Sequence, residues 1–148
     1  GHLFNTAVHT AFRARYASGV ELICKTEDPG FGARFEGTDG WIQYTARAVT
    51  SGPETIKDHV LGSDAIRLPV SDNHYRNFVD AVKSREDPIE PVEVGHRTTT
   101  ICHLGNIAMR LGRKVPWDPE GQSCPNDPEA NAMLQRSYRA PWRLTAAD

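Results

Sequence analysis

The stretch EVGHRTTTICHLGNIAMRLGRKVPWDPE, residues 93–120, decides how the chain is organised. Its apolar residues recur at the spacing of one helix face. We therefore expect a helix from near Gly95 to about Leu111, with Gly112 as its C-cap. The core stripe of this helix would be Ile101, Leu104, Ala108 and Leu111. A strip of small residues beside it predicts close packing on another element, with Cys102 as a core residue: Thr98, Cys102, Gly105 and Met109.

The polar side of this expected helix carries two histidines seven residues apart, His96 and His103. A zinc site needs three or four ligands. Cys102 lies about a hundred degrees round the helix from His103, and no carboxylate shares the stripe, so the pattern does not favour a metal site. Cys102 and His103 are not a catalytic pair either, because neighbours in a helix point apart. A polar helix face is the favoured interpretation, and an independent zinc enzyme is the weakest of the alternatives.

Upstream of this helix the sequence predicts strands. Residues 8–24 alternate apolar and polar side chains around the turn Ala17-Ser18-Gly19, which is a hairpin pattern with one apolar face. Residues 33–48 repeat the pattern around Gly37-Thr38-Asp39-Gly40, with Trp41 facing away from Ile42 and Tyr44. Residues 50–61 are expected to form a loop. Short edge strands are expected at 65–70 (AIRLPV) and 114–118 (KVPWD).

Two more helices complete the expected fold. Residues 71–86 have an apolar stripe of Tyr75, Phe78, Val79 and Val82, and either Ser71 or Asp72 would cap the start. A short third helix would begin at Pro128, with Asp127 as N-cap. The order of strands followed by helices predicts an α+β fold. In this fold, an antiparallel open sheet has helices on one face, and Phe78, Val82, Ile101 and Leu104 cover the apolar side of the first hairpin.

Length and composition are those of one globular domain spanning residues 1–148. The net charge of −2 gives no electrostatic case for binding nucleic acid, and no apolar run approaches the ~20 residues of a membrane span. Three cysteines, odd in number and widely spaced, are expected to be free thiols, with Cys24 and Cys102 half-buried. The chain begins Gly1-His2, a common remnant of tag removal, so we expect a piece of a longer protein and leave its native compartment open.

Four polar residues are candidates for substrate binding: His74, Asn77, His96 and Arg97. His74 and Asn77 lie one turn apart near the start of a helix, where they could reach into a cleft or simply bond to a neighbouring loop. His96 and Arg97 lie in the first turns of the next helix, where an anionic group could be held. The glycines Gly30 and Gly32 do not form G-x-G-x-x-G and are read as turn residues. The residues alone thus indicate no complete catalytic, cofactor or metal site.

Three segments carry a family resemblance: RFEGTDGWI (34–42), residues 73–120, and DPEANAMLQRSYRAPWRL (127–144). Over nearly its whole length the chain resembles the C-terminal domain of bacterial Gfo/Idh/MocA-type oxidoreductases, the family of glucose-fructose oxidoreductase and inositol dehydrogenase. The resemblance implies a partner domain upstream, a Rossmann domain that binds NAD or NADP. It also implies an α+β domain whose open sheet helps shape a cleft for a sugar, sugar derivative or polyol and commonly forms the interface of a homo-oligomer.

The chain departs from the whole family protein at its catalytic half. It lacks a Rossmann fingerprint, and it lacks the Glu-Lys-Pro motif and the Asp-x-x-x-His motif that supplies the family's proton-transferring histidine. All of these would lie upstream, so no catalytic residue is carried over and no cofactor is expected on this chain alone. The expected role is cleft shaping and self-association through the outer sheet face, which includes His9, Arg13, Arg15, Glu21, Ile23, Trp41 and Gln43. The alternative is a stand-alone binding or assembly module.

Overall fold

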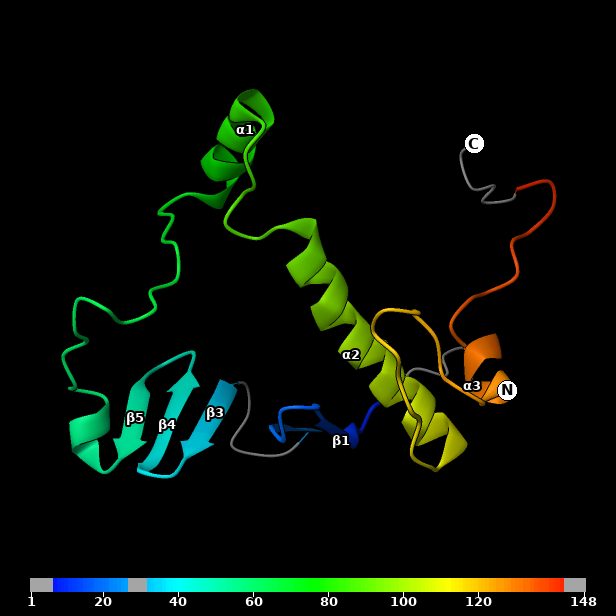
Figure 1. The fold of residues 1–148 in the computed structure, drawn as a ribbon, viewed down its shortest axis with the longest axis horizontal. Helices are drawn as coiled ribbons and strands as arrows, with labels where there is room; N and C mark the ends of the chain where they lie inside the picture. Colours follow the sequence, from blue (N-terminus) through cyan, green and yellow to red (C-terminus); the bar gives the residue numbers. More distant parts are fainter. Residues whose placement is uncertain (1–6, 27–31, 143–148) are drawn as a thin grey trace. The chain divides into compact units, whose positions relative to one another are not determined.

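A computed structural model describes residues 7–26 and 32–142. The chain divides into two compact units, residues 1–25 with 90–148 and residues 26–89. The strands are antiparallel and form two small sheets, ordered β1-β2 and β3-β4-β5. The α+β class with antiparallel strands is therefore confirmed. The described strands form two separate sheets (Figure 1). In the described ranges no helix is both long and apolar enough to cross a membrane.

The first unit begins with the expected hairpin. β1 (Ala11–Arg15) and β2 (Glu21–Lys25) pair with Phe12 opposite Cys24 and Ala14 opposite Leu22. Gly19 has φ 89 in the connecting turn, a left-handed conformation that glycine adopts without a steric penalty. The alternation in the sequence is confirmed in part: Phe12, Ala14 and Cys24 are half-buried, but the other apolar residues of the predicted face are exposed, namely Val8, Tyr16, Val20 and Leu22.

The long helix α2 (Val92–Leu111) packs against β1. Gly105 is buried under Phe12, and the backbone N–H of Ala11 donates to Met109 Sδ at 3.4 Å. The small-residue strip does bring α2 close to the hairpin, at Gly105 and Met109. Cys102 is exposed, which corrects the expectation that it is a core residue.

The core of this unit lies on another side of α2. Ile107 is buried with Cys124 and with Ala130 of the short helix α3 (Pro128–Ala132). Leu104, Leu111, Val115, Trp117, Met133 and Leu134 pack around them. Gly112 caps α2 with φ 63, and the Asp127 side chain caps α3, both as expected. The expected edge strand at 114–118 is reduced to a single bridge between Asp118 and Ser123, because the chain turns back on itself directly after Trp117.

The second unit contains β3 (Gly32–Gly37), β4 (Gly40–Thr45) and β5 (Val49–Gly52). Gly37 pairs with Gly40, so Thr38-Asp39 is the two-residue turn that the sequence predicts. Ile42 and Tyr44 point to one side and Trp41 to the other. The loop expected at 50–61 is wrong in part, because residues 50–52 extend β5 along β4 and Glu54–Ile56 forms the short helix η1. Pairing with β4 supplied the strand, and local sequence gave no sign of it.

The helix α1 (His74–Ser84) has Asn73 as its N-cap, not Ser71 or Asp72. The Asn73 side chain accepts from the backbone N–H of Arg76 at 2.9 Å, which is the usual reach of a cap to the third helical residue. The expected strand at 65–70 is absent, since these residues find no strand partner in the described chain and Pro69 has no N–H to donate.

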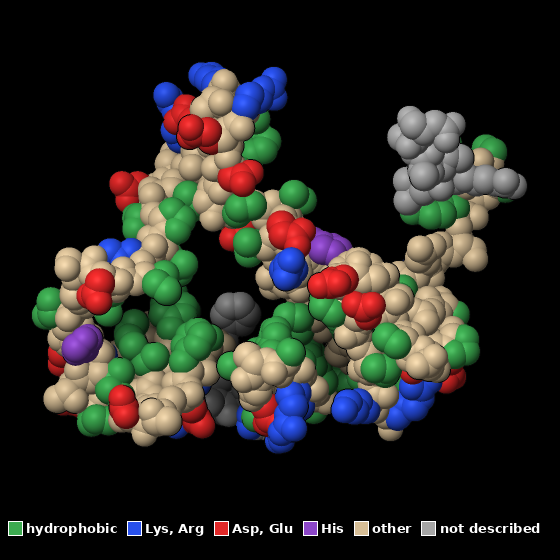
Figure 2. Space-filling view, in the orientation of Figure 1, with side chains coloured by type: hydrophobic (Ala, Val, Ile, Leu, Met, Phe, Trp, Pro, Cys, Tyr) green, Lys and Arg blue, Asp and Glu red, His purple; other side chains and the backbone are tan. Residues whose placement is uncertain are grey.

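The apolar stripe of α1 is exposed, at 75% for Tyr75, 63% for Phe78 and 48% for Val82. Figure 2 shows apolar side chains at the surface in the region of this helix. α1 belongs to the unit of β3–β5, and the first hairpin belongs to the other unit. That Phe78 and Val82 cover the hairpin therefore stays a prediction.

Candidate functional site

On α1, the two candidate residues have different neighbours. The His74 ring lies 4.0 Å from that of Tyr75, centroid to centroid, and the residue is exposed. Asn77 is half-buried, and its side-chain oxygen accepts a hydrogen bond of 3.0 Å from the backbone N–H of Ile89. Asn77 thus ties the segment after α1 back onto the helix. Of the two, His74 is the side chain left available to a ligand.

On α2, His96 and Arg97 project from the second turn and are exposed. Arg97 Nε donates to Glu93 Oε1 at 2.7 Å, one turn earlier. Such an exposed pair on a helix is worth only ~0.3–0.5 kcal/mol, so it orients the guanidinium without committing it. The helix N-terminus has Pro91 as N-cap and no side-chain cap, which leaves backbone N–H groups of the first turn without an intrahelical partner.

His96 contacts a residue that sequence reasoning missed. Its Nε2 lies 2.9 Å from Oε1 of Gln122, 26 positions later in the chain. Gln122 belongs to the loop 118–123, which the Asp118–Ser123 bridge closes. The turn composition Asp-Pro-Glu-Gly at 118–121 predicts a tight loop here. Nothing in that composition says which side chain returns to α2.

The strongest charge cluster supports this part of the fold. Arg113, just after α2, donates to both carboxylate oxygens of Asp127 and to Glu129 Oε2 at 2.9 Å. The hydrogen bonds from Arg113, with that from the Ala130 backbone, lower the pKa of Asp127 to about 2, and the two carboxylates raise the pKa of Arg113. These groups fasten α3 to the end of α2, so their charges serve the structure.

Cys124 is the most deeply buried side chain beside this cluster, with no exposed surface. Its backbone N–H and C=O both bond to the Asn131 side chain, at 2.8 and 2.7 Å. Burial raises the pKa of the Cys124 thiol, and the charge of Asp127 adds to this effect. Cys124 therefore has the environment of an inert core thiol. The sequence-based expectation of half-burial fits Cys24 and overlooked Cys124.

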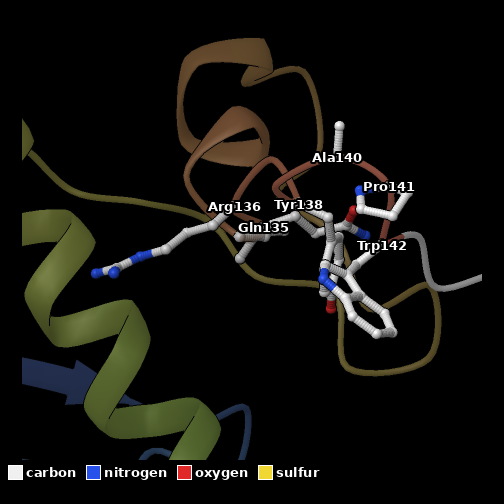
Figure 3. Close-up of a pocket in the computed structure, with 7 residues that line it drawn as sticks. Gln135, Arg136, Tyr138, Ala140, Pro141 and Trp142 are labelled. Carbon is white, nitrogen blue, oxygen red and sulfur yellow. The ribbon is translucent and has the colours of Figure 1, made fainter.

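An open hollow lies over the segment after α3, and Figure 3 shows side chains that line it, among them Tyr138 and Trp142. Tyr138 and Trp142 are 57% and 67% exposed. The other lining residues are Leu134, Gln135, Arg136, Ala140 and Pro141. The Arg136 side chain points away from the hollow in Figure 3. Within the residues described, no group of three or more His, Cys, Asp or Glu side chains is placed to hold a metal ion.

The candidate residues fall into two sets. His74 and Asn77 belong to the unit of residues 26–89, and His96 and Arg97 belong to the other. Arg97 bonds to Glu93 one turn earlier on the same helix, whereas His96 bonds to Gln122, a polar side chain from a distant loop. The α2 surface around His96 is therefore the best-defined candidate site on the chain.

A family model for the oxidoreductase family, C-terminal alpha/beta domain, matches residues 4–144. The match covers almost the whole chain and spans both units. The chain belongs to the Gfo/Idh/MocA oxidoreductase family. It represents the C-terminal alpha/beta domain of that family. No curated protein and no solved structure matches the chain.

Proposed function

We propose that this Gfo/Idh/MocA C-terminal domain works as part of an NAD(P)-dependent oxidoreductase that acts on a sugar, sugar derivative or polyol. The family match over residues 4–144 supports this proposal. The sequence carries no G-x-G-x-x-G fingerprint, so nicotinamide binding would fall to a Rossmann domain upstream. The domain alone would then be inactive, and its role would be to shape the cleft that receives the substrate.

Three exposed side chains suit a hydroxyl-rich ligand. In one unit, His96 and Arg97 offer an imidazole and a guanidinium on adjacent positions of α2. In the other unit, and considered by itself, α1 offers the imidazole of His74. Sugars and polyols are bound by hydrogen bonds to individual hydroxyls, and a site built to make those bonds discriminates strongly between hydroxyl patterns. Asn77 is less suited to this role because its oxygen already accepts from Ile89.

The proposal is tested in the protein that the complete reading frame encodes. That frame should place a strand, a G-x-G-x-x-G turn and a helix upstream of this domain. In that protein His96→Ala should raise KM for the sugar or polyol with a smaller effect on kcat. The loss of a group that only binds substrate weakens substrate affinity more than it slows the chemical step. His103→Ala is the matched control, since His103 lies two turns further along the same side of α2. Equal effects of the two changes would count against His96.

The alternative is a binding or assembly module that works without a catalytic half. The missing nicotinamide fingerprint is the observation that keeps it open. A reading frame that encodes no dinucleotide-binding domain would favour this alternative.

Self-association through the outer sheet faces is the second part of the proposal. On the hairpin, Arg13 and Arg15 both pair with Glu21, at 3.2 and 2.8 Å, beside Ile23, which is 57% exposed. Arginine and large apolar groups are enriched in protein interfaces. On the second sheet, Trp41 lies over Gly52, and the Arg34 guanidinium stacks 4.1 Å from its ring centroid. Trp41 is thus partly committed within its own sheet.

Ile23→Glu is therefore a cleaner probe of this interface than a change at Trp41. Light scattering across a range of concentrations should show an oligomer for the unmodified chain and a shift toward monomer for Ile23→Glu. Leu22→Thr is a control on the opposite side of the same strand. A strictly monomeric unmodified chain would end this part of the proposal, and an oligomer indifferent to Ile23→Glu would move the interface elsewhere.

A further inference from the structure

Gln122 has an unusual backbone for a residue with a side chain. Its φ is 47, in the left-handed region that costs an L-residue roughly 1–2 kcal/mol. The surrounding loop holds it there. Asp118 and Ser123 exchange backbone hydrogen bonds at 2.9 and 3.3 Å, and the Glu120 backbone N–H donates to Asp118 Oδ1 at 3.0 Å. A strained residue in a closed loop is placed with little freedom, so its side chain is presented in one direction.

The orientation of the Gln122 amide follows from its two bonds. Its Nε2 donates to the backbone oxygen of Pro119, and its Oε1 faces His96 Nε2 at 2.9 Å. An amide oxygen can only accept, so the proton of this second bond belongs to His96 Nε2. In the neutral ring the lone pair then lies on Nδ1. His96 is exposed, and no described residue bonds to its Nδ1.

We propose that Gln122 is a positioning residue that holds His96 in the Nε2–H tautomer and so presents Nδ1 as an acceptor for a hydroxyl of the sugar or polyol. The ligand half of this inference rests on the function proposed above, whereas the tautomer half does not. The arrangement is one that ligand-binding histidines use in general, where the bond at one ring nitrogen fixes what the other can do.

The tautomer is measured by long-range nitrogen NMR of the histidine rings in the 148-residue chain at about pH 9, where an unperturbed imidazole is neutral. His96 should be almost wholly Nε2–H in the unmodified chain and in Gln122→Glu, whose carboxylate also only accepts. In Gln122→Leu it should become the mixture of tautomers of a solvent-exposed imidazole. His103, exposed on the same helix, provides that reference in the same spectrum. An unchanged tautomer ratio in Gln122→Leu would overturn the inference.

The ligand half is measured in the complete enzyme, with whichever of glucose, fructose or inositol it oxidises. Gln122→Leu should raise KM several-fold with a smaller change in kcat. At alkaline pH, Gln122→Glu should have a KM close to that of the unmodified enzyme. If Gln122→Leu changes the ratio of tautomers but not KM, Nδ1 of His96 does not accept from the substrate, and the part of the proposal that concerns the ligand is wrong. If the complete protein oxidises none of these compounds and binds no nicotinamide, the proposed function fails, and the tautomer result is unaffected.

Discussion

The ring of Phe12 lies against the backbone of Gly105, so close that a Cβ on Gly105 would come within 2.4 Å of a ring carbon. This contact is how the β1–β2 hairpin approaches α2. Gly105→Ala should therefore lower the free energy of unfolding by about 1–3 kcal/mol, as overpacking does, although alanine is the better helix former by about 1 kcal/mol. Urea denaturation followed by circular dichroism measures the change.

Gly95→Ala is the control for this prediction, because a Cβ there meets no atom within 4 Å. It should stabilise by up to about 1 kcal/mol through helix propensity alone. Phe12→Leu combined with Gly105→Ala should recover part of the loss. Equal responses to alanine at 95 and 105 would show that Phe12 does not rest on Gly105.

The left-handed residues that end α1 and α2 should respond in opposite directions when one is replaced by glycine and the other by alanine. Arg85 ends α1 with φ 65 and Gly112 ends α2 with φ 63. Arg85→Gly should stabilise by about 1 kcal/mol, and Gly112→Ala should destabilise by a similar amount, because left-handed backbone costs a residue with a Cβ roughly 1–2 kcal/mol. A Cβ at Gly112 has open space around it, so crowding plays no part. Thermal melts of the two variants would contradict this if both moved in the same direction.

Asp127 predicts an acid-sensitive step in stability. Its pKa falls from the ordinary 3.8 to about 2 in the folded chain, chiefly through the hydrogen bonds from Arg113. A lowered folded pKa means that Asp127 contributes stability above about pH 4, and that this contribution is lost as pH falls from about 4 to about 2. Urea titrations between pH 6 and pH 2 should show a shallower loss for Asp127→Asn. The same pH dependence in both proteins would refute the assignment.

The three thiols should react in a fixed order. Cys102 is exposed, Cys24 is half-buried and Cys124 is fully buried with a raised pKa. Iodoacetamide attacks the thiolate, so under native conditions Cys102 should be alkylated first and Cys124 last. Mass spectrometry of peptides at successive times gives the order, with the urea-unfolded chain as the control in which all three react alike. Early labelling of Cys124 would contradict its place in the core.

Local motifs in the sequence predict local structure well. The Gly37–Gly40 turn sets the register of β3 and β4, Gly112 ends α2, and Asp127 caps α3. Each of these depends on a few neighbouring residues whose backbone preferences are strong. The apolar alternation of the first hairpin also predicts correctly that Phe12 and Cys24 share its buried side.

Local sequence patterns do not predict contacts between segments that are distant in the chain. The His96–Gln122 bond spans 26 positions, and a left-handed glutamine has no local signal. Cys124 is buried in the cluster with Ile107, and the Asn131 side chain bonds to its backbone, whereas Cys102 is exposed. The polarity of Asn77 suggests a ligand contact, yet its side-chain oxygen accepts from the backbone N–H of Ile89. In each case a tertiary partner decided the outcome.

We propose that this domain is the substrate-side part of a nicotinamide-dependent enzyme. Calorimetric titration with NADH and NADPH, on the protein from the complete reading frame and on the 148-residue chain side by side, measures whether this is so. We expect the complete protein to bind one of the two cofactors with micromolar affinity and the chain to bind neither. Binding to the chain alone, or to neither protein, would contradict the claim.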